Sequence, residues 1–222
     1  MIDGREHFQK ELLKLNDLIL KMGAMVEQSI VNSVEALKKA NPKLAQEVIN
    51  SDDTLDQVEL EVDDMCLELL ATQQPMAVDL RFITTGMRIG TDLERIGDLA
   101  VDIAQRAAEL SQQPLLKPLI DIPKMAELAE KMVHRALDAF VKRDANLART
   151  LWQDEEKADE YRDLIHDELL EIMSKDSQTT PRALPLILIS RHLERIADHA
   201  TNIAEDVVYM VEGKVIKHAP KI

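Results

Sequence analysis

The sequence predicts an all-α protein that is internally duplicated, with two three-helix bundles of six helices in total and a pseudo-twofold relation between them. The segment LERIGDLAVDIA at 93–104 returns as LERIADHATNIA at 193–204, with eight of twelve positions identical. Upstream of it, apolar positions of the first half recur a constant 103 residues later, as in Met22 and Met125. Such self-similarity indicates a repeated structural unit. Few glycines and prolines, with abundant Ala, Leu, Ile, Met, Glu and Asp, favour packed helices.

The first half contains three helical patterns. The first covers about residues 5–40, and its apolar stripe consists of Leu12, Leu15, Ile19, Met22, Val26, Ile30, Val34 and Leu37. Asn41 followed by Pro42 is typical of a helix start, with a capping acceptor before proline in the first turn. The second helix is expected to run to about Thr72. Pro75 precedes the third, which is expected to end near Leu110.

The second half repeats this order. Pro114, Pro118 and Pro123 mark the boundary between halves, so the predicted units are residues 1–113 and 121–222. Asp144 stands where Asn41 stood and is expected to cap the fifth helix. The pair Thr180-Pro181 is expected to cap and start the sixth helix.

Charge and cysteine content narrow the class of protein. A net charge of −14 argues against nucleic acid as a partner, because phosphate binding needs clustered lysine and arginine. The single cysteine, Cys66, excludes an internal disulfide and fits a reducing compartment. The chain shows no signal region and no apolar run near the ~20 residues needed to cross a bilayer. We therefore expect a soluble, cytoplasmic protein that is not inserted in a membrane.

Two acidic pairs occur in each half, all with the form acidic-x-x-x-acidic. They are Asp52 with Asp56, Glu94 with Asp98, Glu155 with Asp159, and Glu194 with Asp198. Residues four apart point the same way on a helix, where like charges destabilise it by roughly 0.2–0.5 kcal/mol. A bound cation would compensate, since carboxylate oxygens are ligands for Mg, Mn, Ca and Fe. These eight residues are the candidate metal ligands.

The orientation of the pairs leaves a second interpretation open. At about 100° per residue, Glu94 and Asp98 point away from the apolar stripe of their helix, so any metal would lie on an outer surface. Outward charges are usually just solvated. Arg95 and Arg195 follow the glutamates and could neutralise part of the acidic face or pair across the halves.

Recognisable catalytic motifs are absent from the sequence. There is no Glu-x-x-His of di-iron bundles, no glycine-rich phosphate loop and no Gly-x-Ser-x-Gly elbow. The sequence therefore shows no recognisable catalytic set. Two kinds of protein remain open on the acidic pairs alone: a metal-dependent phosphohydrolase that uses paired carboxylates, and a metal-free helical scaffold.

The chain resembles the PhoU family of phosphate-signalling regulators over nearly its whole length. The resemblance rests on Leu-Glu-Arg-Ile-x-Asp at 93–98 and 193–198, on the acidic pairs, and on Gln-Pro-Met-Ala-Val-Asp-Leu-Arg at 74–81. It implies multinuclear metal clusters at the acidic pairs, with iron first and Mn, Mg or Zn as alternatives. Asp102 and Asn202 are second-line ligands.

The resemblance also implies function and partners, and it favours a regulatory adaptor that does no chemistry over the two alternatives above. Such a protein restrains phosphate uptake and phosphate-starvation signalling through the phosphate ABC transporter and its sensor histidine kinase, both membrane-associated. A duplicated chain can mimic a dimer within one molecule or still form a homodimer, and both remain open.

Overall fold

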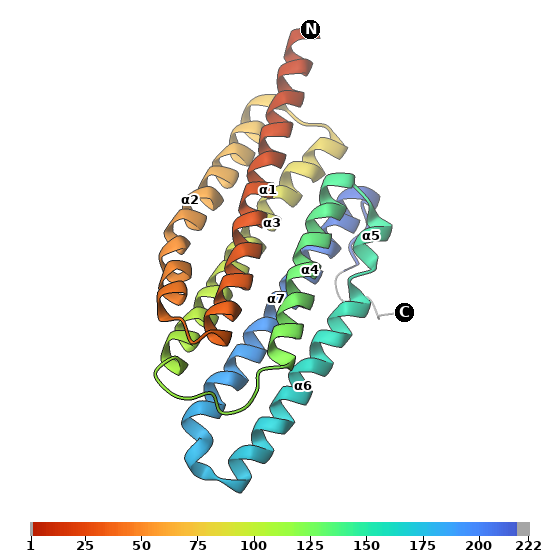
Figure 1. The fold of residues 1–222 in the computed structure, drawn as a ribbon. Helices are drawn as coiled ribbons and strands as arrows, with labels where there is room; N and C mark the ends of the chain where they lie inside the picture. The colour runs from red at the N-terminus through yellow and green to blue at the C-terminus, as the bar shows by residue number, and fades with distance from the viewer. Residues whose placement is uncertain (1, 217–222) are drawn as a thin grey trace.

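The computed structural model describes residues 2–216, and over that range it contains helices and no β-strand (Figure 1). The helices are α1 (Ile2–Lys38), α2 (Pro42–Gln73), α3 (Ala77–Leu110), α4 (Asp121–Lys142), α5 (Ala145–Arg149), α6 (Trp152–Lys175) and α7 (Thr180–Glu212), with a 3₁₀ turn η1 at Ser177–Thr179. The predicted all-α class is confirmed. The fifth predicted helix is interrupted by a turn at Thr150 and Leu151, which separates the short α5 from α6.

Two of the three predicted helix caps are correct. Asn41 caps α2, since its side chain accepts hydrogen bonds from the backbone N–H of Lys43 and Leu44. Asp144 caps α5 through the backbone N–H groups two and three residues ahead. The prediction that Thr180 caps the last helix is wrong. Thr180 is already helical, and the preceding turn η1 is capped instead by the Asp176 side chain.

The two repeats meet along two antiparallel seams. In the first, α3 lies against α7: Arg88 contacts Asp206, Asp92 contacts His199, and the midpoint falls near the paired motif residues 96 and 196. In the second, α1 lies against α4, and Glu27 contacts His134. Because each helix meets its own counterpart antiparallel, the repeats are related by a pseudo-twofold axis across the helices.

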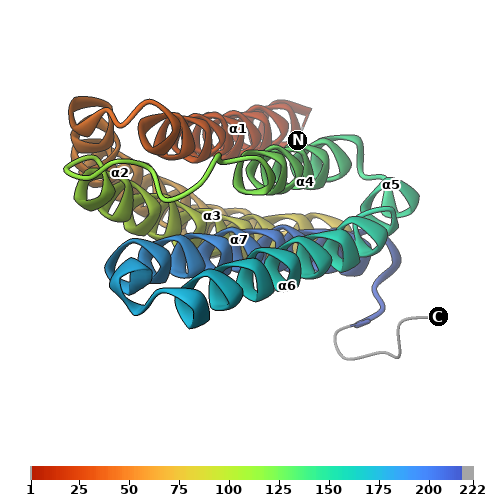
Figure 2. The same cartoon turned by 60° about the horizontal axis from the view of Figure 1, so that its bottom comes forward.

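Helices α3 and α7 form the centre of the molecule (Figure 2). Helix α3 packs on α1, α2 and α7, and α7 packs on α3, α4 and α6. Small residues allow close approach within this arrangement. A Cβ on Gly23 of α1 would lie 2.2 Å from Leu137 Cδ1 of α4, so any larger residue there would force the Leu137 side chain to move.

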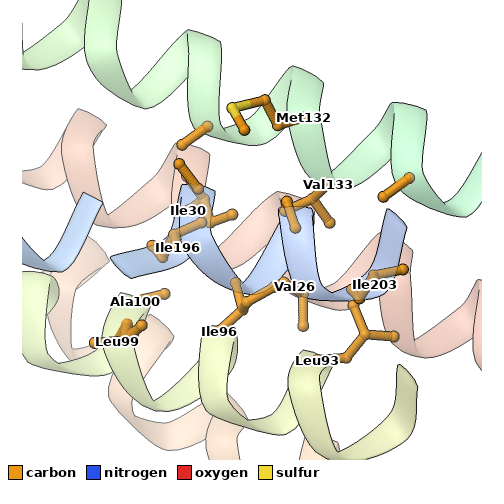
Figure 3. Packing of buried hydrophobic residues seen from close by; sticks show 14 of the residues in the cluster. Val26, Ile30, Leu93, Ile96, Leu99, Ala100, Met132, Val133, Ile196 and Ile203 are labelled. Carbon is orange, nitrogen blue, oxygen red and sulfur yellow. The ribbon is translucent and has the colours of Figure 1, made fainter. Parts of the chain in front are cut away.

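One hydrophobic core runs through both repeats. The predicted stripe of α1, from Leu12 to Leu37, is buried along its whole length. Figure 3 shows side chains of four helices converging between the repeats: Val26 and Ile30 of α1, Leu93, Ile96, Leu99 and Ala100 of α3, Met132 and Val133 of α4, and Ile196 and Ile203 of α7. The repeats therefore stabilise each other by shared burial of apolar surface, and the unit boundaries at 113 and 121 stay a prediction.

Three of the contacts between repeats pair a histidine of the second with a carboxylate of the first. His199 Nδ1 lies 2.8 Å from Asp92 Oδ1, and His134 Nδ1 lies 3.1 Å from Glu27 Oε1. His192 Nδ1 lies 3.8 Å from Asp102 Oδ2. An aromatic contact adds to them, since Phe82 stacks on Phe140 with ring centroids 5.1 Å apart.

Among the helices that the structure describes, none combines the length and the apolar content that a membrane crossing requires.

Candidate functional site

The four predicted ligands of the first repeat lie on one outer face, where α2 and α3 run side by side. Burial raises the pKa of Asp52, and the carboxylates of Asp56 and Asp98 raise it further. Burial also raises the pKa of Glu94, as does the carboxylate of Asp98. Mutual repulsion of this kind requires proximity. The structure thus brings together the pairs Asp52–Asp56 and Glu94–Asp98, which are about forty residues apart in sequence.

Gly97 sets the distance between the two helices at this face. A Cβ built on Gly97 would lie 2.1 Å from Leu55 Cδ2 of α2, well inside any real contact, and 3.8 Å from Asp52 Oδ1. Glycine therefore permits α2 to lie directly on α3 between Glu94 and Asp98. At the equivalent positions, the second repeat has Ala197 and Ala158, and both are buried. It therefore packs two small side chains together where the first repeat packs a glycine against a leucine.

Arg95 partly neutralises its own acidic pair rather than pairing across the repeats. Its guanidinium lies 3.3 Å from Glu94 Oε2 and 3.3 Å from Asp98 Oδ2. The arginine and aspartate side chains are about half exposed, so the ion pairs add little stability. The glutamate is less accessible, with 25% of its side chain exposed.

The second repeat assembles an equivalent carboxylate set on α6 and α7. Burial raises the pKa of Asp198 to about 6, together with the nearby carboxylates of Glu194, Glu155 and Asp159. All four predicted ligands of this repeat are therefore neighbours. Partial burial and then these three like charges together disfavour the ionised form of Asp198.

Arg162 of α6 is part of this second set and was not anticipated from the sequence. Its guanidinium lies 2.8 Å from Glu194 Oε1, 2.9 Å from Asp159 Oδ1 and 2.9 Å from Asp163 Oδ1. The offset of 103 aligns Arg162 with Glu59, and that alignment is the signal that could have revealed it. In the first repeat, burial and the neighbouring carboxylates raise the pKa of Glu59, whereas Arg95 lowers it.

The two sets therefore differ in charge. The first contains Asp52, Asp56, Glu59, Glu94 and Asp98 around the single guanidinium of Arg95. In the second, Arg162 replaces a carboxylate and bridges α6 to α7. Asp102, a second-line candidate, does not join the first set closely; it lies near His192 on the α3–α7 seam.

Carboxylate oxygens in such a set are chemically suited to a hard cation. In the described range 2–216, however, no group of three or more Asp, Glu, His or Cys side chains is arranged to hold a metal ion. Both repeats offer the oxygen donors that a hard cation accepts. In the second repeat the guanidinium of Arg162 already supplies positive charge.

The geometry does not suggest nucleophilic catalysis by the thiol. Cys66 is fully buried, and burial raises its pKa to about 12. A thiol in that state is not ionised at neutral pH and is a poor nucleophile. What the two carboxylate sets offer is acidic surface, on α2 and α3 in the first repeat and on α6 and α7 in the second.

Comparisons with known proteins agree with this architecture. The family model described as the PhoU domain matches twice, at residues 19–107 and 122–207. A protein of Aquifex aeolicus named "Phosphate-specific transport system accessory protein PhoU homolog" is 39% identical over 94% of this chain and 95% of its own length. The corresponding Escherichia coli protein, PhoU, is 32% identical over 95% of this chain and 88% of its own length.

Solved structures give the same result. The crystal structure of PhoU from Pseudomonas aeruginosa matches with a TM-score of 0.89 and 38% identity, over 93% of this chain and 100% of that one. The phosphate transport system regulatory protein PhoU from Streptococcus pneumoniae matches with a TM-score of 0.87 and 30% identity, over 94% and 98%. The duplicated helical repeat, the acidic pairs and these full-length matches lead to one conclusion: the chain belongs to the PhoU family.

Proposed function

We propose that this protein is the accessory and regulatory component of a phosphate transport system. It acts in the cytoplasm, binds the phosphate ABC transporter and its sensor histidine kinase, and restrains phosphate uptake and starvation signalling when phosphate is plentiful. The observation that carries the proposal is similarity over nearly the whole length to proteins named phosphate-specific transport system accessory proteins. A relative of known structure is named a regulatory protein of that system.

The physical basis of regulation is docking. Long helices that share one core form a rigid body, and a rigid body that binds one conformation of a partner better than another shifts that partner's equilibrium. Such a protein needs no catalytic centre. The protein's role is then set by which surfaces its helices present.

Metal binding is part of the proposal. Asp52, Asp56, Glu94 and Asp98 would hold cations between α2 and α3, and Glu155, Asp159, Glu194 and Asp198 would do so between α6 and α7. Iron is the first candidate, with Mn, Mg and Zn as alternatives. A bound cation would offset the burial and the carboxylate repulsion that together raise the pKa of Asp52 and Glu94. The first set is expected to bind more tightly, since Arg162 competes in the second.

The regulatory part is tested in cells. A deletion strain is compared with its parent using a phosphate-responsive reporter in ample phosphate. Loss of the protein is expected to leave the reporter switched on, and the intact chain supplied in trans should restore repression. Normal repression in the deletion strain would overturn the proposal.

The metal part is tested on protein purified without added metal. Glu94→Ala with Asp98→Ala is expected to lower bound metal by about half, because one of two sets is lost. Asp64→Ala with Glu68→Ala is the matched control, since it removes an exposed pair on α2 with the same spacing and charge. Equal metal content in both variants and the parent would show that the predicted ligands are only surface charge.

A phosphatase assay on the same samples tests the enzyme alternative, and we expect no metal-dependent turnover.

A further inference from the structure

A groove opens between α1 and α2, next to the carboxylate set of the first repeat. It has a volume of about 530 Å³ and is floored by Gly97 and Val101 of α3. Its apolar walls include Met25 and Leu55. That volume is within the range of about 300–1,000 Å³ typical of ligand pockets.

The duplication provides an internal comparison for this groove. The offset of 103 places Arg135 where the groove has Asn32, and Asp154 where it has Ser51. In the second repeat these two side chains form an ion pair between α4 and α6, with Arg135 Nη1 2.6 Å from Asp154 Oδ2. Asp154 is only 7% exposed. Although burial raises it, hydrogen bonds from Lys157 and Arg135 lower the pKa of Asp154 below its usual value.

The second repeat thus fills this position with its own guanidinium. The first repeat has only a short amide and a hydroxyl there, and both are already used locally. The Ser51 hydroxyl donates to the Val48 carbonyl at 2.7 Å, and Asn32 Oδ1 accepts from Gln28 Nε2 at 2.9 Å. Neither side chain bridges α1 to α2, so the space between the helices stays open.

The charged residues that line the groove favour a cation, with two carboxylates against one ammonium group. Glu47 and Asp52 line its α2 side. Lys21 on α1 is the opposing charge. Because α1 and α2 run antiparallel, Lys21 lies toward the Leu55 end and Glu47 toward the Asn32 end. A guanidinium at the level of Asn32 and Ser51 would therefore reach carboxylates, while its aliphatic stem would cover the apolar walls.

We propose that this groove receives an arginine side chain of a protein partner, which takes the place that Arg135 occupies in the second repeat. The planar guanidinium suits carboxylates such as Glu47 and Asp52. This inference goes beyond the proposed function, since phosphate regulation could proceed without it.

The test is an NMR titration of the ¹⁵N-labelled full chain with acetyl-Ala-Arg-Ala-amide in the presence of EDTA. The control peptide has citrulline in place of arginine, which keeps the shape and removes the charge. We expect saturable shifts at the backbone amides of Gln28, Asn32 and Ser51, with at least ~10-fold weaker binding of the citrulline peptide, the lower range for a hydrogen bond to a charged group. Equal binding of both peptides, or shifts that avoid the groove, would overturn the proposal.

A transplanted ion pair gives the decisive variant. Asn32→Arg with Ser51→Asp copies the second repeat, leaves the net charge unchanged and is expected to abolish the shifts. Gln9→Arg with Gln57→Asp, at exposed positions of the same two helices, is the matched control and should bind like the parent. If the transplanted pair prevents folding, Glu47→Gln at an exposed position serves instead, with an expected ~3- to 10-fold loss of affinity. Unchanged binding in either groove variant would contradict the proposal.

Discussion

At the scale of single residues, Gly97 controls how closely the two acidic helices approach. Gly97→Ala is expected to destabilise the protein by about 1–2 kcal/mol, because the new methyl group meets the buried Leu55 side chain. Leu55→Ala alone should cost about 2–4 kcal/mol by leaving a cavity. The double variant reproduces the Ala158 and Ala197 pair of the second repeat. Urea unfolding of all four proteins measures the coupling. The double variant should be more stable than the sum of the single losses predicts. Strict additivity would show that a methyl group at position 97 does not clash with Leu55.

Asp198 links the second carboxylate set to pH. Its pKa is raised to about 6 from the ordinary value of 3.8, so its ionisation costs stability in the folded state. Its contribution to stability is present below pH 4 and is lost as the pH rises through about 6. Asp198→Asn should therefore stabilise the metal-free protein at pH 8, by on the order of 0.5 kcal/mol, because the side chain is only partly shielded from water.

The measurement is urea unfolding of the parent and the Asn variant at several pH values with a chelator present. The difference between the two proteins should shrink toward zero as the pH falls from 8 to about 4. A difference independent of pH would indicate that the pKa of Asp198 is not raised in the folded protein.

At the scale of helices, two of the three predicted caps accept hydrogen bonds from backbone N–H groups, and the third, Thr180, does not. Asn41→Ala should cost about 1 kcal/mol, since two backbone N–H groups of α2 lose their acceptor. Thr180→Ala should change stability by less than about 0.5 kcal/mol, because Thr180 makes no capping hydrogen bond and lies within α7. Thermal unfolding of the two variants compares them directly, and equal losses would contradict the assignment of the α7 start.

At the scale of the whole molecule, the shared core predicts one cooperative transition. The single tryptophan, Trp152, lies in the second repeat, and the single cysteine, Cys66, is buried in the first. Tryptophan fluorescence and thiol labelling therefore report separately on the two repeats. In a urea series, both signals should change at the same midpoint, because neither repeat can expose its face of the core alone. Two separated midpoints would show that the repeats unfold independently.

Before unfolding begins, Cys66 should resist labelling, because the thiol is buried and burial raises its pKa to about 12.

Helices, apolar stripes and the shared faces of the acidic pairs followed from the sequence alone. These features depend on the fixed 3.6-residue period, so Leu12 to Leu37 and the pair Glu94–Asp98 could be placed without knowing what they contact. The internal duplication also predicted that the two halves have the same helix order and are related by a pseudo-twofold axis. Thr180 was misplaced because a threonine before proline can also occupy the first helical turn when an upstream residue, here Asp176, caps a 3₁₀ turn.

Only the tertiary structure decided which helices meet and at what distance. The contact of Gly97 with Leu55, the bridge made by Arg162, and the open groove beside Asn32 all join residues far apart in sequence. Such contacts depend on how whole helices pack, which is a sum over many weak side-chain contacts and not a local preference. A long arginine side chain can also reach several acceptors, so the sequence could place Arg162 on α6 but could not choose Glu194 as its partner.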